Sequence, residues 1–173
     1  MRDDGTTVSN ITAPIATPAA AAAADRGSYS TSDIEAQSLA AAAADGPLTL
    51  AFFPGVYSRT CTKELCQLRD WTDDVTDMDG VLYGVSADTP WSHLAFIDEY
   101  EISYPLMSTF NNTLAAEFDV ERTESVLAGI TDRAVFVLDP ELTIRYAWTT
   151  TESLVFPDLE AIESTIETIT AEQ

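Results

Sequence analysis

Residues 48–53 form an uninterrupted apolar run, Leu-Thr-Leu-Ala-Phe-Phe, that stops abruptly at Pro54-Gly55. Such a run is typical of a strand buried on both faces of a parallel or mixed sheet. After a short loop, residues 61–75 contain neither glycine nor proline and repeat large apolar side chains at helical spacing. We therefore expect a central strand that leads directly into a helix beginning near Cys61.

The remaining apolar segments continue this alternation of strands and helices. We expect a strand over 81–86, a helix over 91–100 with Pro90 in its first turn, a short helix within 112–118, strands over 134–138 and 143–148 joined by a turn at 139–142, and a final helix over 157–170. The order β-α-β-α-β-β-α fits an α/β sandwich of thioredoxin type, in which helices flank a central mixed sheet.

The chain of 173 residues is long enough for one domain with a substantial core, and we expect a single domain over 1–173. Residues 1–45 are weakly patterned and alanine-rich, with tracts at 19–24 and 40–44. We expect this part to be irregular, with short strands and turns and a short helix over 38–44. We expect no function there.

The formal net charge is −21, from 29 acidic and only 8 basic side chains. This balance argues against nucleic acid or an anionic membrane as a partner, because both are bound through clusters of Lys and Arg. The acidity can serve solubility alone. Our sharper hypothesis is adaptation to high salt, where ions screen the repulsion between carboxylates, and hence a halophilic, haloarchaeal source.

The sequence contains no apolar run near the roughly 20 residues that cross a bilayer, and its start does not have the pattern of a signal peptide, so we expect a cytoplasmic protein. Two cysteines and the single His93 provide too few ligands for structural zinc. A glycine-rich phosphate loop, a Ser-His-Asp arrangement and a haem signature are also lacking. We expect no metal and no cofactor, and we expect His93 to be a partly exposed side chain without a catalytic role.

Cys61 lies where the predicted strand gives way to the predicted helix. The backbone N–H groups and the dipole at the start of a helix favour a thiolate over a thiol, so we expect a reactive sulfur. Arg59 and Lys63 add positive charge nearby, although both can point into solvent. The Ser58 hydroxyl can face the sulfur or a bound oxygen, or it can cap the helix.

The segment around Cys61 resembles the active site of the peroxiredoxin family, whose pattern is Pro, three residues, Thr or Ser, two residues, Cys. Here Pro54, Ser58 and Cys61 meet the pattern, and the likeness extends over residues 48–148. The resemblance implies that Cys61 attacks hydrogen peroxide or an organic hydroperoxide and becomes a sulfenic acid, with Pro54 shielding the sulfur. It further implies that Arg133, from another strand, lies beside the sulfur, although Arg133 could instead form a surface salt bridge.

Cys66 follows Cys61 by five residues, so an intact helix places the two side chains roughly 140° apart with a rise of about 7.5 Å. A disulfide needs Cα atoms within about 7 Å, so the first helical turns would have to unwind. The closest resemblance is to atypical two-cysteine members of the bacterioferritin-comigratory type, which implies that Cys66 resolves the sulfenic acid and that a thioredoxin-like or glutaredoxin-like protein reduces the disulfide. Alternatively, Cys66 is a small buried side chain and an outside thiol resolves the sulfenic acid.

Two other classes remain open: a thioredoxin-fold thiol–disulfide exchange protein or redox-regulated chaperone without peroxidase turnover, and a non-catalytic interaction domain. Disulfide oxidoreductases use Cys-x-x-Cys, whereas this chain has Cys-x4-Cys, which favours the peroxidase. The sequence leaves open whether the protein is a monomer or a homodimer. Five aromatic side chains could line the mouth of the pocket or belong to the core: Phe52, Phe53, Tyr57, Trp91 and Trp148.

Overall fold

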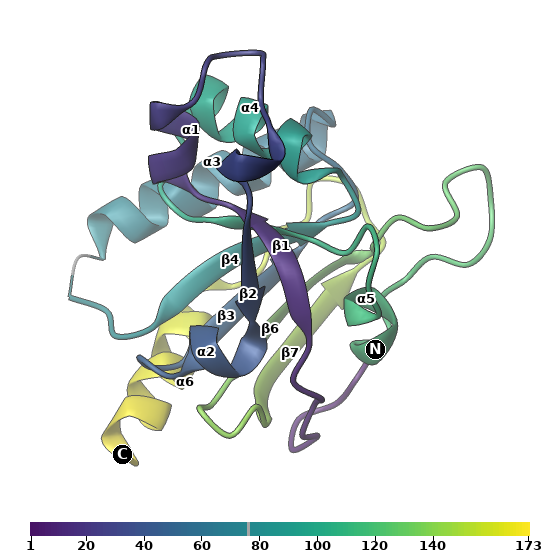
Figure 1. Ribbon diagram of the computed structural model, residues 1–173. Coiled ribbons are helices and arrows are strands. Elements are labelled where there is room, and N and C mark those ends of the chain that lie inside the picture. Colours follow the sequence, from purple (N-terminus) through teal and green to yellow (C-terminus); the bar gives the residue numbers. More distant parts are fainter. Residues whose placement is uncertain (76) are drawn as a thin grey trace.

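Figure 1 shows the computed structural model, which describes residues 1–75 and 77–173. Seven strands form one mixed sheet in the order β2-β1-β5-β4-β3-β6-β7, in which β3–β4 and β4–β5 are parallel and the other pairs are antiparallel. The strands are β1 (Thr12–Ala16), β2 (Glu35–Ser38), β3 (Leu48–Phe52), β4 (Val81–Ser86), β5 (Leu106–Ser108), β6 (Arg133–Leu138) and β7 (Ile144–Thr150).

Six α-helices and one short 3-10 helix accompany the sheet in the described residues: α1 (Pro18–Ala23), η1 (Thr31–Asp33), α2 (Leu39–Ala43), α3 (Arg59–Asp74), α4 (Pro90–Tyr100), α5 (Leu114–Glu117) and α6 (Leu159–Ala171). None of them combines the length and the apolar character required to cross a membrane.

The sheet carries a hydrophobic core on each face, and the alternation of side chains along β3 shows why. Leu48, Leu50 and Phe52 point into the core that α2 and α5 cover, while Ala51 points into the core formed with α1, α3, α4 and α6. All five residues of β3 are buried. The predicted thioredoxin-like sandwich, with helices around a mixed sheet, is confirmed (Figure 1).

The predicted elements from β3 onward are present, with shifted ends that local capping explains. α3 begins at Arg59, two residues before Cys61, because the side chain of Ser58 caps it. α6 begins at Leu159 rather than at 157 because Asp158 accepts hydrogen bonds from two backbone N–H groups of its first turn. The short helix predicted within 112–118 is a single turn, α5.

The first 45 residues are more regular than we predicted. β1 pairs with β2 and with β5, so this segment completes one end of the sheet, and each alanine tract supplies part of a short helix. α2 lies inside the predicted range 38–44 with Ser38 as its cap. The short strands and the short helix expected in this part are present, and pairing with β5 orders a segment whose own pattern is weak.

β5 was not predicted. It has only three residues, all buried, and it lies between β4 and β1 in the sheet. Gly84 of β4 permits close packing here: a Cβ atom at this position would lie 2.6 Å from Leu106 Cδ2 and 3.3 Å from Phe53 Cε1.

Candidate active site

Cys61 is the third residue of α3, immediately beyond the loop that follows β3. Its side chain is fully buried. Its backbone N–H donates to Ser58 Oγ at 3.3 Å, so the structure places Ser58 as the helix cap, which is one of the two roles considered for it. The sulfur therefore lies within the first turn of a helix of 16 residues, where unpaired N–H groups and the helix dipole favour negative charge.

Arg133, the first residue of β6, brings a guanidinium group to this sulfur. Arg133 Nη2 lies 3.3 Å from Cys61 Sγ, and Arg133 Nη1 forms an ion pair with Glu64 Oε2. The Arg133 side chain is only 7% exposed, so the surface salt bridge considered from the sequence does not occur. A buried cation in contact with the sulfur stabilises negative charge there.

Glu64 is a functional residue that sequence reasoning missed. Its side chain is 1% exposed, and within the described residues Oε2 is paired with Arg133 while Oε1 has no hydrogen-bond partner. Glu64 lies three residues after Cys61, and residues at this spacing share a helix face. An acidic residue on the buried face of the cysteine helix was the available signal. Its charge offsets that of Arg133 and fixes the direction in which the guanidinium points.

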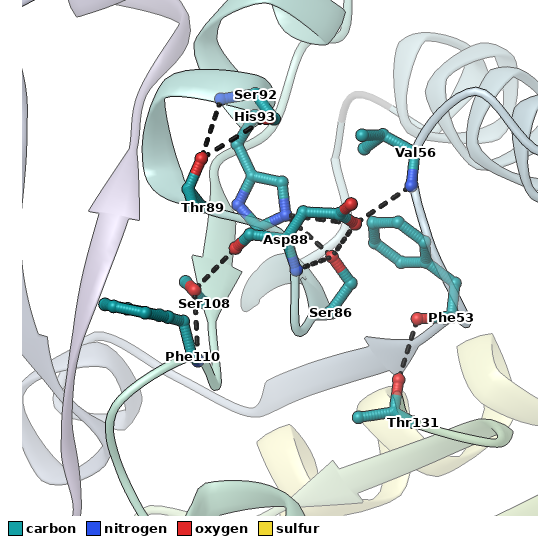
Figure 2. Close-up of polar contacts among 10 residues, drawn as sticks. All are labelled: Phe53, Val56, Ser86, Asp88, Thr89, Ser92, His93, Ser108, Phe110 and Thr131. Atoms are coloured by element: carbon teal, nitrogen blue, oxygen red, sulfur yellow. Dashed lines mark hydrogen bonds and ion pairs between the residues drawn. The ribbon is translucent and has the colours of Figure 1, made fainter. Parts of the chain in front are cut away.

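The loop before α3 is held from two sides (Figure 2). Thr131 Oγ1 donates to the carbonyl oxygen of Phe53 at 2.7 Å, and the backbone N–H of Val56 donates to Asp88 Oδ2 at 2.9 Å. Asp88 Oδ2 also accepts from Ser86 Oγ at 2.6 Å. The ends of β4 and of the segment before β6 therefore position the loop that carries Pro54 and Ser58.

His93 on α4 is part of this support, and our expectation of a partly exposed side chain is wrong. The imidazole is fully buried, with Nε2 2.7 Å from Ser86 Oγ and 3.9 Å from Asp88 Oδ2 (Figure 2). Because Ser86 donates its proton to Asp88, His93 Nε2 is the donor to Ser86, and Nδ1 has no partner among residues 1–75 and 77–173. Burial lowers the pKa of His93 from its ordinary 6.5 to about 4, against the opposing effect of Asp88, so the ring is neutral at pH 7.

Cys66 lies on the second turn of α3 and is half-buried. Both cysteines are free thiols. Burial raises the pKa of the Cys66 thiol, while the positive charge of Arg69 lowers it. Because α3 is intact from Arg59 to Asp74, residues 61 and 66 point roughly 140° apart, and the two free thiols do not meet.

The other residues singled out in the sequence divide between surface and core. Pro54 is half-buried beside the loop, and Arg59 and Lys63 are exposed, in agreement with side chains that point into solvent. Among the aromatic residues, Phe52 and Phe53 belong to the core, Trp148 is half-buried, and Tyr57 and Trp91 are 50% and 43% exposed. Tyr57 has a φ of 68°, a left-handed backbone directly before the helix cap.

A thioredoxin-like sandwich with a buried cysteine in the first turn of the helix after a central strand, and with a buried arginine on that sulfur, defines a thiol-redox class of protein. Within the part of the chain that the structure describes, no three His, Cys, Asp or Glu side chains gather to hold a metal ion. Residues 16–147 match the sequence profile of the AhpC/TSA family. The chain belongs to this family, the peroxiredoxins, which confirms the resemblance seen in the sequence.

Individual relatives agree with this assignment. A Mycobacterium tuberculosis protein described as a peroxiredoxin is 32% identical over 97 residues, which cover 56% of this chain and 63% of the relative. A Coxiella burnetii protein of the bcp type is 30% identical over 103 residues, covering 57% of this chain and 68% of that protein. The chain thus aligns with less than two thirds of the mycobacterial relative.

Solved structures share the fold. The structure of BcpB from Mycobacterium tuberculosis superposes with a TM-score of 0.74 at 24% identity, covering 100% of this chain and 99% of the other. AhpC from the same organism gives a TM-score of 0.79 at 16% identity, with 100% and 96% coverage. At these identities the likeness establishes the fold.

We predict that Arg133→Gln destabilises the protein strongly, because it leaves the Glu64 carboxylate buried without its partner. The expected loss in the free energy of unfolding is about 3–5 kcal/mol, measured by urea denaturation of the reduced protein. Arg145→Gln is the control, since its ion pair with Glu172 is exposed and should contribute under about 1 kcal/mol. Equal losses in the two variants would contradict the buried pair.

We predict that His93 makes stability depend on pH. Its pKa in the folded protein, about 4, lies below the ordinary 6.5, so the unfolded chain binds the proton more tightly between these values. Stability is therefore complete above pH 6.5 and is lost as the pH falls toward 4, by on the order of 3 kcal/mol. His93→Gln keeps a donor near the position of Nε2 but does not titrate, so its urea midpoint should fall less between pH 7 and pH 4.5. Parallel pH profiles for the two proteins would refute this role.

Proposed function

We propose that this protein is a thiol peroxidase in which Cys61 is the attacking group. The contact of Arg133 Nη2 with the buried Cys61 sulfur, at 3.3 Å in the first turn of α3, carries the proposal. A cation and a helix start meet at one sulfur, and both favour the nucleophilic thiolate.

The first step transfers one oxygen atom. The Cys61 thiolate attacks one peroxide oxygen, the S–O bond forms as the O–O bond breaks, and the second oxygen departs with a proton as water or an alcohol. Cys61 is oxidised to the sulfenic acid and the peroxide is reduced. The departing oxygen gains negative charge, which the Arg133 guanidinium and the backbone N–H groups at the helix start can stabilise. Ser58 accepts from Cys61 N–H and so keeps its own hydroxyl proton for a peroxide oxygen.

The second step joins the two cysteines. Cys66 attacks the sulfenic sulfur of Cys61, the S–S bond forms and the oxygen leaves as water. In the folded helix the two side chains point roughly 140° apart, so the first turn of α3 must unwind beforehand. We propose that a thioredoxin-like or glutaredoxin-like dithiol then reduces the disulfide. Such a cycle, and two free thiols, suit the reducing conditions of the cytoplasm.

The peroxidase prediction is tested by one stoichiometric addition of hydrogen peroxide to the reduced protein. We expect rapid loss of both thiols and the formation of a disulfide between Cys61 and Cys66. Both changes are measured by quenching the reaction and by mass spectrometry. Cys66→Ser should stop at the Cys61 sulfenic acid, and Cys61→Ser should react no faster than a free thiol.

The wild-type protein and the Cys66→Ser variant each distinguish one alternative. If wild-type protein consumes peroxide no faster than a free thiol, the thiol–disulfide exchange class gains support and the peroxidase is wrong. If Cys66→Ser keeps full turnover with the same reductant, an outside thiol resolves Cys61.

We also propose that the acidic surface is an adaptation to high salt, consistent with a haloarchaeal source. The net charge of −21 implies self-repulsion, which ions screen over about 10 Å at 0.1 M and about 3 Å at 1 M. Dialysis from high to low salt should therefore lower the melting temperature of the purified protein. An unchanged melting temperature in low-salt buffer would remove the reason for this proposal.

A further inference from the structure

The third turn of α3 carries an arginine that the mechanism above leaves unused. Arg69 lies three residues after Cys66, and its Nη1 is 3.8 Å from Cys66 Sγ. The same nitrogen donates to the carbonyl oxygen of Tyr100, at the end of α4, at 2.6 Å. Nε and Nη2 contact Asp70 Oδ1 at 3.0 and 2.9 Å. The guanidinium is therefore fixed beside the second sulfur by a backbone oxygen and a carboxylate.

We propose that Arg69 is the residue that activates Cys66, by stabilising its thiolate for attack on the Cys61 sulfenic acid. This inference rests on the proposed peroxidase function and concerns its second step. The Cys66 thiolate displaces hydroxide from the sulfenic sulfur, the S–O bond breaks, the S–S bond forms, and the hydroxide takes up a proton to leave as water. The oxidising equivalent is the one that the peroxide supplied, so no further reagent is required.

Arg69 can act in this step because the part of α3 that it shares with Cys66 is anchored independently of the first turn. Tyr104 Oη donates to the carbonyl oxygen of Leu65 at 2.6 Å, and Thr72 Oγ1 lies 3.2 Å from Ser103 Oγ. These bonds join the part of α3 from Leu65 to Thr72 to the connection between α4 and β5. Residues three apart on a helix are neighbours, so while this part stays helical Arg69 remains at Cys66.

The first turn has different anchors. The Ser58 cap and the contact of Arg133 with Cys61 hold it, and the ion pair of Arg133 with Glu64 lies one turn further along α3. Oxidation of Cys61 to a sulfenic acid removes the negative charge that Arg133 contacts, which weakens one of these anchors and none of those between Leu65 and Thr72. The first turn is then the part that moves, and it delivers the sulfenic acid to a stationary, activated Cys66.

The charged and titratable groups around Cys66 are few. Arg69 and Asp70 face it from its own helix, and Tyr104 faces it from the α4–β5 connection. Burial and the nearby Cys66 raise the pKa of Tyr104 well above its ordinary value, so Tyr104 stays protonated as a donor. Arg69 is thus the positive group that opposes the effect of burial on the Cys66 thiol.

The test uses Arg69→Gln, Arg69→Lys and, as a matched control, Arg145→Gln. Each reduced protein receives one equivalent of hydrogen peroxide, and sulfenic acid and disulfide are followed separately by quenched mass spectrometry. We expect Arg69→Gln to form the Cys61 sulfenic acid at the wild-type rate and the disulfide roughly three- to tenfold more slowly at pH 7, a modest factor because a less acidic thiol is also a better nucleophile. Arg69→Lys should recover part of the rate and Arg145→Gln should match wild type.

A second measurement isolates Cys66. In the Cys61→Ser background, the rate of alkylation of Cys66 by iodoacetamide is measured against pH, and adding Arg69→Gln should move the profile to higher pH. An unmoved profile, or a disulfide rate equal to wild type, would overturn the role of Arg69, as would equal slowing of sulfenic acid and disulfide formation. Consumption of peroxide by wild-type protein no faster than by a free thiol would instead refute the peroxidase, and the alkylation profile would still decide the effect of Arg69 on Cys66.

Discussion

The buried contact between Arg133 and the first turn of α3 is the constraint on which the site depends. β6 lies beside β3 in the sheet, so the first residue of β6 lies next to the loop by which β3 passes into α3. Burying a guanidinium is costly unless it is paired. Glu64 provides the partner, and the cation that this pair holds in place is the group that contacts the sulfur. The geometry of the reacting atoms is therefore tied to the core and not to a mobile surface loop.

The proposed mechanism requires the same helix to be rigid for the first step and mobile for the second, and its contacts divide accordingly. In the first turn, the contact of Arg133 with Cys61 depends on the charge of the sulfur. Further along α3, Leu65 and Thr72 are held by uncharged hydrogen bonds to Tyr104 and Ser103. Oxidation of Cys61 would change the contacts of the first turn and leave the hydrogen bonds further along α3 unchanged. A single helix can therefore unwind at one end without loss of the apolar contacts that Leu65, Leu68 and Trp71 make with the sheet.

Local pattern was sufficient for the central part of the fold and for the position of Cys61. An apolar run that ends at Pro-Gly and precedes a helical repeat determines its own structure, since its signals lie within a few residues of one another. β5 has three residues and β1 a weak pattern, and both exist because each provides the other with a neighbour in the sheet. Pairing between segments that are far apart in the sequence cannot be predicted from the pattern of a few neighbouring residues.

The site residues also divide into those that local pattern predicts and those that depend on contacts between distant segments. The position of Cys61 followed from the helix start, but the burial of His93 and Glu64 did not, because a polar residue on a helix is usually taken to face solvent. α4 is covered on the side that carries His93 by the Ser86–Asp88 end of β4, which only the assembled sheet reveals.

Charge distribution links the site to the rest of the molecule. Of the eight basic side chains, Arg59, Lys63 and Arg69 lie on α3 and Arg133 contacts it. Of these four, Arg133 contacts the Cys61 sulfur and Arg69 the Cys66 sulfur. Salt acts unequally on these groups. It screens exposed charges and has less effect on buried ones, and the Arg133 side chain is 7% exposed while that of Arg69 is 26% exposed. In concentrated salt the contact of Arg133 with Cys61 should persist while the effect of Arg69 on Cys66 weakens. In the proposed cycle, the reaction with peroxide is therefore better protected than the step that closes the disulfide.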